Sequence, residues 1–180
     1  METVKNKKRI LAISGSTRRN SSNELILKFI GQHYADVLEV ELYEGIDLLP
    51  HFNPDLVKEN PPAVVIEFRE KIQAADGILI CTPEYVFSLP GSMKNALEWT
   101  VSTTVFSDKP TAFIVASASG AEAFQSLNLI LTTIQAKIAL DSRLLIQGVK
   151  GKVGPLGQIN DSATRQGIDT LVNSLLNSID

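Results

Sequence analysis

The amino-acid sequence predicts a three-layer α/β/α fold around a mostly parallel five-stranded sheet. Five short apolar segments recur along the chain, and the stretches between them carry apolar residues at spacings of three and four, as amphipathic helices do. Strands that alternate with helices form parallel sheets with right-handed crossovers, which place helices on both faces. The 180 residues, of which 44% are hydrophobic and 21% charged, suit a soluble protein with a sizeable core. We therefore expect residues 1–180 to form a single domain.

The first predicted strand covers residues 10–13, a continuous apolar segment typical of a strand buried on both faces. The small residues 14–16 end it. From Glu24 onward apolar residues recur at helical spacing, so a helix is expected to follow. The candidates for the N-cap of this helix are Asn20, Ser21 and Ser22.

The rest of the chain alternates in the same way. Residues 37–43 alternate apolar with acidic side chains and predict a strand with one solvated face, whereas the proline-containing residues 48–56 predict an irregular segment. Further strands are expected over residues 77–81, 111–116 and 144–146. Further helices are expected from residues 61–62 to about residue 75, and over residues 92–102, 122–139 and 163–179. The glycine-rich residues 148–157 show no core pattern and predict a mobile loop or an oligomer contact.

Composition excludes several classes of function. A net charge of −3 argues weakly against nucleic acid as the main partner. The one cysteine, Cys81, cannot form an internal disulfide, and with no signal peptide this favours the cytoplasm; we interpret the thiol as a small core residue. No apolar segment reaches the roughly 18 residues of a membrane span, so no membrane partner is expected. His33 and His51 lack partners at metal-ligand spacing, so no metal site is expected.

Three loops are expected to meet at one edge of the sheet, because ligands of such folds bind at the carboxyl ends of the strands. These loops are residues 14–23, 83–91 and 117–120. The first combines serine hydroxyls, Arg18 and Arg19 with the N-terminus of a helix, a combination that favours a phosphate. The alternative is a capped turn whose arginines are merely solvated.

Other nucleotide-binding and catalytic patterns do not match the first loop. It lacks the Gly-x-Gly-x-x-Gly of dinucleotide sites and the Gly-Lys-Ser/Thr of triphosphate loops. The strand ends lack the acidic residues of a phosphoacceptor domain, and the chain has no Gly-x-Ser-x-Gly of a serine hydrolase. The remaining candidate ligand is a phosphate monoester, held by hydroxyls, backbone amides and Arg18.

Residues 83–99, Pro-Glu-Tyr-Val-Phe-Ser-Leu-Pro-Gly-Ser-Met-Lys-Asn-Ala-Leu-Glu-Trp, resemble the Pro-Glu-Tyr and Pro-Gly-x-Leu-Lys-Asn-Ala-x-Asp-Trp signature of the NADPH-dependent FMN reductase family. Residues 15–23 resemble the FMN-phosphate loop of the same family, and residues 49–56 resemble its segment after the second strand. The three matches occur in order across the first hundred residues. The resemblance implies a flavodoxin-like fold with strand order 2-1-3-4-5.

Carried over residue by residue, the resemblance implies an FMN site and no catalytic side chain, because the cofactor performs the chemistry. The residues implied at the flavin phosphate are Ser16, Arg18, Ser21, Ser22 and Asn23. Those implied at the isoalloxazine ring are Pro83, Glu84, Tyr85, Val86, Phe87, Ser117, Ser119 and Gly120.

The chain departs from the family pattern at Val86, where the family usually has Asn, so only backbone groups remain for a polar contact at this position. The loop after the fourth strand is also poorer in glycine than the resemblance leads us to expect, and Phe124 can either cover the ring or pack inside. We interpret Trp99 as a core aromatic residue.

The resemblance implies an FMN-dependent oxidoreductase that passes hydride from NADPH or NADH through flavin N5 to a small-molecule electron acceptor. The acceptor classes are quinones, azo compounds, metal oxyanions and free flavin. The alternatives are a non-enzymatic electron carrier or redox sensor, and a degenerate site kept for protein interaction. A homodimer or homotetramer is expected, with residues 96–105 and 122–139 supplying apolar contact surface.

Overall fold

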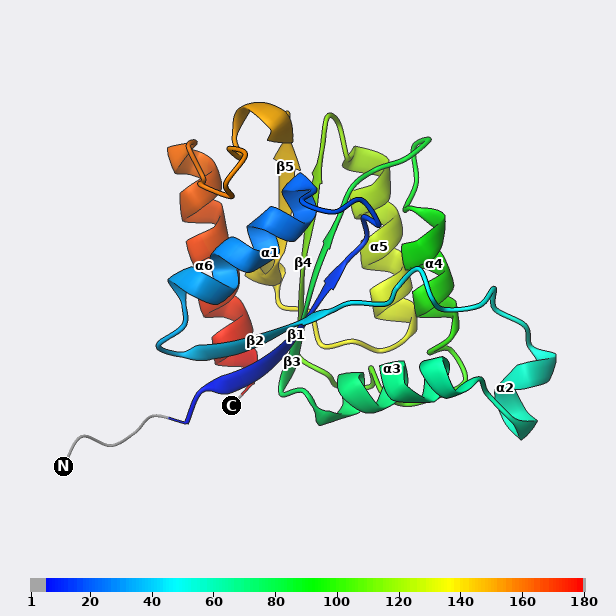
Figure 1. The fold of residues 1–180 in the computed structure, drawn as a ribbon. Coiled ribbons are helices and arrows are strands. Elements are labelled where there is room, and N and C mark those ends of the chain that lie inside the picture. The colour runs from blue at the N-terminus through cyan, green and yellow to red at the C-terminus, as the bar shows by residue number, and fades with distance from the viewer. Residues whose placement is uncertain (1–5, 180) are drawn as a thin grey trace.

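The computed structural model describes residues 6–179, except for the side chains of residues 58 and 59. A five-stranded parallel sheet lies at its centre, with strand order β2-β1-β3-β4-β5 (Figure 1). The strands are β1 (Lys8–Ser14), β2 (Leu38–Tyr43), β3 (Gly77–Thr82), β4 (Thr111–Ser117) and β5 (Arg143–Gln147). The predicted fold class and strand order are therefore confirmed.

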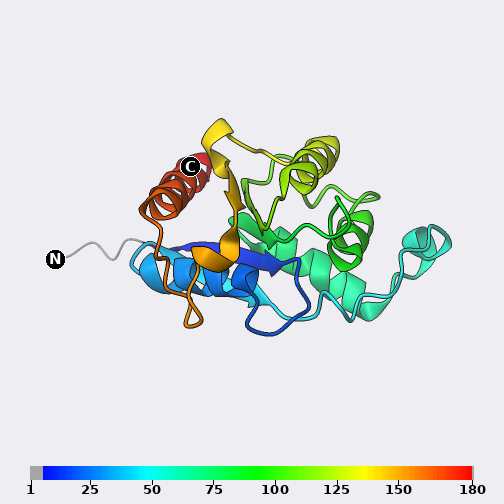
Figure 2. The same cartoon turned by 90° about the horizontal axis from the view of Figure 1, so that it is seen from above.

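Helices cover both faces of the sheet, and Figure 2 shows the two groups on either side of it. α1 and α6 pack on one face, while α3, α4 and α5 pack on the other; α2 projects away from the sheet (Figure 1). The helices are α1 (Ser22–His33), α2 (Asp55–Glu59), α3 (Ala63–Ala74), α4 (Gly91–Glu98), α5 (Ala121–Thr133) and α6 (Ser162–Ser178), with two 3₁₀ turns, η1 (Leu140–Ser142) and η2 (Val149–Gly151). Within residues 6–179 no helix combines the length and apolar character that crossing a membrane requires.

The core has two halves because successive side chains of a strand point to opposite faces. In β1, Leu11 and Ile13 join the half under α3, α4 and α5, whereas Ile10 and Ala12 join the half under α1 and α6. Trp99 is fully buried in the first half, and its indole N–H donates to the Pro50 carbonyl at 2.7 Å. Its interpretation as a core residue is confirmed.

Two predicted helices end earlier in the structure. α4 stops at Glu98 rather than residue 102, and α5 stops at Thr133 rather than residue 139. After α5 the chain turns at Gln135, which has a φ of 63°, and the Thr111 N–H then donates to the Lys137 carbonyl at 2.9 Å. The apolar residues beyond position 133 keep a helix-like spacing, but they pack as an extended segment beside the start of β4.

Part of residues 148–157, for which a mobile loop or an oligomer contact was expected, packs against the core. Its η2 turn carries Val149, which is buried together with Val153 in the core half under α1 and α6. The irregular segment expected over residues 48–56 also differs at its end, where α2 begins at Asp55. Short single-turn elements of this kind leave no apolar period for sequence analysis to detect.

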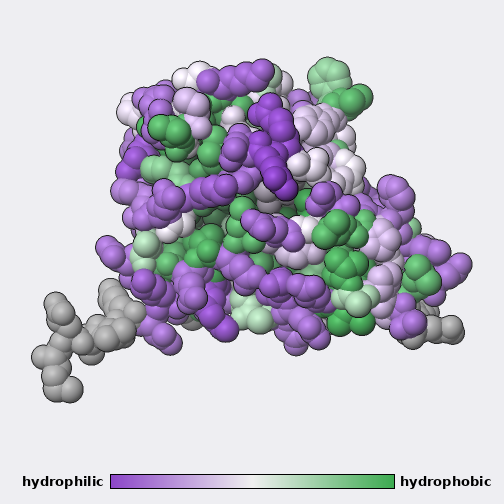
Figure 3. All heavy atoms as spheres, in the orientation of Figure 1, coloured by the Kyte–Doolittle hydropathy of each residue, from purple (hydrophilic) through white to green (hydrophobic). Residues whose placement is uncertain are grey.

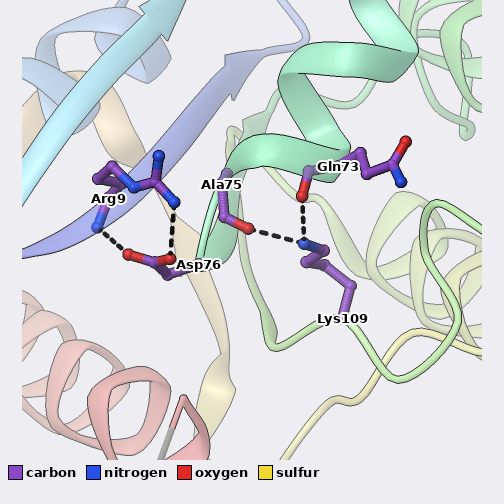
Figure 4. A network of polar contacts seen from close by, with 5 residues as sticks. All are labelled: Arg9, Gln73, Ala75, Asp76 and Lys109. Carbon is purple, nitrogen blue, oxygen red and sulfur yellow. Dashed lines mark hydrogen bonds and ion pairs between the residues drawn. The ribbon is translucent and has the colours of Figure 1, made fainter.

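Charged side chains form a hydrogen-bond network at the amino edge of the sheet, the edge at which the strands begin (Figure 4). The Arg9 backbone N–H donates to Asp76 Oδ2 at 2.8 Å, and the Arg9 guanidinium donates to Asp76 Oδ1 at 3.2 Å. Lys109 Nζ donates to the carbonyls of Gln73 and Ala75 at 3.1 and 2.7 Å, where α3 ends. Cations favour helix C-termini because unpaired carbonyls gather there.

Candidate cofactor site

A cavity of about 400 Å³ opens at the carboxyl edge of the sheet, where loops that follow β1, β3, β4 and β5 meet. The residues that line it are Ser16, Arg18, Ser21, Ser22, Asn23, Pro83, Tyr85, Ala116, Ser117, Ala118, Gly148, Val149 and Lys150. The three loops predicted from sequence to share one rim are therefore brought together. A larger hollow of about 660 Å³ lies at the amino edge, but Arg9, Lys109 and Lys137, which line it, already bond to Asp76 or to backbone carbonyls.

The loop after β1 is held close to β3. The Gly15 N–H donates to the Cys81 carbonyl at 2.9 Å, and a Cβ at position 15 would lie 2.0 Å from Thr82 Oγ1. Glycine is therefore required for this close approach. Beyond it, Ser16 is buried at the edge of the cavity, and its Oγ accepts the Arg18 N–H at 3.3 Å.

Ser21 is the N-cap of α1, as its backbone angles and its bond to Glu24 N–H at 3.2 Å show. Of the three candidates named from sequence, the structure thus selects this one. The hydroxyl of Ser21 accepts in the cap and still has its own proton to donate. Helix N-termini attract anions through unpaired N–H groups and the helix dipole, so the start of α1 gives this side of the cavity an anion-binding character.

Asn23 ties α1 to the sheet beneath the cavity. Its Nδ2 donates to the Ala116 carbonyl at 3.3 Å, and its Oδ1 accepts from the Cys81 thiol at 3.3 Å. Burial raises the pKa of the Cys81 thiol, so the cysteine stays protonated and acts as the small core residue expected from sequence. Both ends of the Asn23 amide are engaged within the protein.

The loop after β3 forms a tight two-residue turn. Tyr85 and Ser88 exchange two backbone hydrogen bonds of 2.9 and 3.1 Å around Val86 and Phe87, whose φ angles are 50° and 55°. Pro83 and Tyr85 line the cavity, whereas Val86 and Phe87 are 94% and 77% exposed and do not. This turn forms the apolar tip at the upper edge of Figure 3.

Glu84 does not line the cavity; it caps α5. Its carboxylate accepts backbone N–H groups of Gly120, Glu122 and Ala123 at 3.1, 3.0 and 3.0 Å. The bond from Ala123 is the first of three that lower the pKa of this carboxyl. Glu84 therefore joins the loop after β3 to the loop after β4. Ser117 lines the cavity, whereas Ser119 and Gly120 do not.

Phe124 packs inside, against Phe113 at a ring-centroid distance of 5.1 Å. This observation resolves the alternative that the sequence left open.

Sequence reasoning missed the wall formed by Gly148, Val149 and Lys150. The Gly148 N–H donates to the Ala118 carbonyl at 3.1 Å, which holds this wall beside the loop after β4. A usable signal existed, because residue 148 directly follows β5, and the carboxyl ends of all parallel strands meet at the same edge.

The family model for NADPH-dependent FMN reductase matches residues 8–150. The chain belongs to this family. It is 32% identical to the NADH:(hydroxy)cinnamate reductase subunit CrdA of Vibrio ruber over 157 residues, which cover 84% of this chain and 77% of that one. It is 30% identical to the NADH-dependent flavin reductase subunit 2 of Lactobacillus johnsonii over 183 residues, covering 96% and 97% of the two chains.

Among solved structures, the flavoenzyme NAD(P)H:(acceptor) oxidoreductase FerB of Paracoccus denitrificans superposes with a TM-score of 0.83 at 28% identity, covering 96% of this chain and 97% of that one. The flavodoxin-like fold and the membership of an oxidoreductase family, both implied by the sequence resemblance, are confirmed. FMN and a nicotinamide coenzyme are the cofactors of this family.

The residues present fit FMN. The cavity joins hydroxyl donors and Arg18 at the start of α1 to a wall of Pro83, Tyr85 and Ala116. A flavin mononucleotide needs a site of this dual character, since it joins a phosphate to an aromatic ring. Of the described residues that line the cavity, Arg18 and Lys150 carry charge, and both are cations.

Proposed function

We propose that the protein is an FMN-dependent oxidoreductase that takes hydride from NADPH or NADH and passes two electrons to a second acceptor. One observation carries this proposal: in a chain of the FMN reductase family, a helix N-terminus with serine hydroxyls and an arginine shares one cavity with an apolar wall. FMN, when bound, supplies a hydride acceptor at N5. The protein binds and orients it and shields it from water.

We assign the phosphate to the hydroxyls of Ser16, Ser21 and Ser22 and to the guanidinium of Arg18. We assign the ring to the wall of Pro83 and Tyr85. Asn23, which lines the cavity, keeps one Nδ2 proton for the phosphate, because the amide donates only one to Ala116 and accepts from Cys81 through Oδ1. We also propose that Asn23 holds the start of α1 against the ends of β3 and β4 through these two bonds.

The second acceptor is a small molecule of the quinone, azo, metal oxyanion or free flavin class. An unspecified acceptor, as in the name of FerB, suits an open cavity whose rim carries the exposed Tyr85. The single cysteine is free and buried, which suits the reducing cytoplasm in which we place the enzyme.

The experiment loads the purified protein with FMN, removes unbound flavin by desalting, and records the visible flavin spectrum. Oxidation of NADPH and NADH with menadione is then followed in the loaded protein. Retained FMN with rapid coenzyme oxidation supports the proposal. Retained FMN with both coenzymes inert supports an electron carrier or sensor, and loss of all FMN on desalting contradicts flavin binding itself.

A further inference from the structure

Lys150 stands on a firmly anchored part of the segment between β5 and α6. The Gly148 N–H donates to the Ala118 carbonyl, and the Val153 N–H donates to the Val149 carbonyl at 3.0 Å. Val149 and Val153 are both buried in the core. These contacts fix the backbone of Lys150 at the edge of the cavity. The sequence of this turn shows no periodic apolar pattern from which its packing could be predicted.

This segment lies against the beginning of α1. Gly157, near its far end, approaches α1 so closely that a Cβ there would lie 3.4 Å from the Leu25 carbonyl oxygen. Figures 1 and 2 both show η2 beside the N-terminal end of α1. The turn that carries Lys150 therefore lies beside the start of α1, the end assigned to phosphate, and Lys150 lines the same cavity as Arg18, Ser21 and Ser22.

The Lys150 ammonium group is available to bind an anion in the cavity. Arg18 and Lys150 both line it, and neither side chain forms a hydrogen bond or ion pair with the part of the chain that the structure describes. Among residues 6–179, those that line the cavity include no carboxylate. Lys152 differs: it does not line the cavity, and its charge acts on Asp161.

We propose that Lys150 is a second cation of the phosphate site and, with Arg18, sets the preference for a phosphorylated flavin. This inference rests on the proposed function. A phosphate monoester carries a charge of about −1.5 to −2 at pH 7. The Arg18 guanidinium neutralises one negative charge of the phosphate, and the Lys150 ammonium neutralises most of the remaining charge. The dipole of α1 further stabilises the bound phosphate.

The test compares dissociation constants for FMN and riboflavin, measured by quenching of flavin fluorescence, in the wild type, Lys150→Gln, Lys150→Arg and Lys152→Gln. We expect Lys150→Gln to weaken FMN binding about tenfold and to leave riboflavin unchanged, since a hydrogen bond to a charged group is lost. Lys150→Arg restores most of the affinity, and Lys152→Gln stays within about twofold of the wild type. FMN binding by Lys150→Gln also falls less steeply with added salt.

Three other outcomes of these titrations would overturn the role of Lys150. Equal FMN affinities in Lys150→Gln and Lys152→Gln would overturn the role of Lys150 and leave the proposed function standing. Equal losses of affinity for FMN and riboflavin in Lys150→Gln would show that Lys150 packs against the flavin and does not contact the phosphate. This result too would overturn the inference. A wild type that binds neither flavin would overturn the proposed function and the inference together.

Discussion

At the scale of single residues, two adjacent arginines differ in their position relative to the cavity. Arg18 lines it and Arg19 does not. We predict that Arg18→Ala weakens FMN binding about 10- to 100-fold with little effect on riboflavin, because a charge-assisted contact to the phosphate is lost. Arg19→Ala is the matched control and leaves both affinities within about twofold. Equal losses of FMN and riboflavin in Arg18→Ala would reject the assignment, and fluorescence titration decides between these results.

A second prediction at this scale concerns Val86, a β-branched residue at a φ of 50° with its side chain 94% exposed. The left-handed region costs such residues roughly 1–2 kcal/mol, whereas asparagine adopts it more easily. We expect Val86→Asn to raise the free energy of unfolding by about 1 kcal/mol, measured from the urea midpoint at constant slope. Val101→Asn changes another exposed valine, one without positive φ, and yields no gain. A Val86→Asn variant no more stable than wild type would show that the turn carries no such strain.

At the scale of elements, Glu84 holds two loops together by capping α5. We predict that Glu84→Gln destabilises the protein by about 1 kcal/mol, since the amide that replaces one oxygen faces backbone N–H groups. The pKa of Glu84 is lowered in the folded protein, so its contribution is present above the unfolded value near 4.5 and is lost as the pH falls through the folded value. The stability difference between wild type and Glu84→Gln should therefore shrink below about pH 4.5. Glu122→Gln is the control, because it removes a nearby negative charge that does not cap α5. Both variants are compared with the wild type by urea unfolding across pH. An equal destabilisation by Glu122→Gln would contradict the role of Glu84.

At the scale of the whole molecule, exposed apolar side chains lie on two segments that we expected to contact another subunit. Val101 follows α4 and is 64% exposed, and Leu129 on α5 is 67% exposed. We propose that these surfaces form a homodimer or homotetramer, because burial of apolar area drives association. Light scattering at micromolar concentration should give a mass of two or four chains, and Leu129→Glu should shift it toward one. A wild-type mass of one chain would refute this prediction.

The sheet and the position of the cavity were predictable, because buried strands such as residues 77–81 are continuously apolar and end in small polar residues. The end of α5 was not, since Ile134 and Ile138 keep a helical spacing while the backbone pairs with residues 108–111 through tertiary contacts. Among the candidate site residues, Arg18 and Tyr85, which the motifs single out, line the cavity. The cap made by Glu84 depends on contacts between loops distant in sequence, which no local pattern encodes. The wall around Lys150 was predictable only from its place directly after β5, because its own residues carry no motif.

The division between the two edges of the sheet has a practical consequence for attaching the molecule to a surface. β1 begins with Lys8 and α6 ends with Ser178 at the amino edge, where Lys137 Nζ donates to the Ser178 carbonyl at 2.9 Å (Figure 1). The cavity opens at the opposite edge. A linker joined before Lys8 would therefore tether the enzyme to an electrode or a bead with the cavity mouth directed toward solution, open to coenzyme and acceptor.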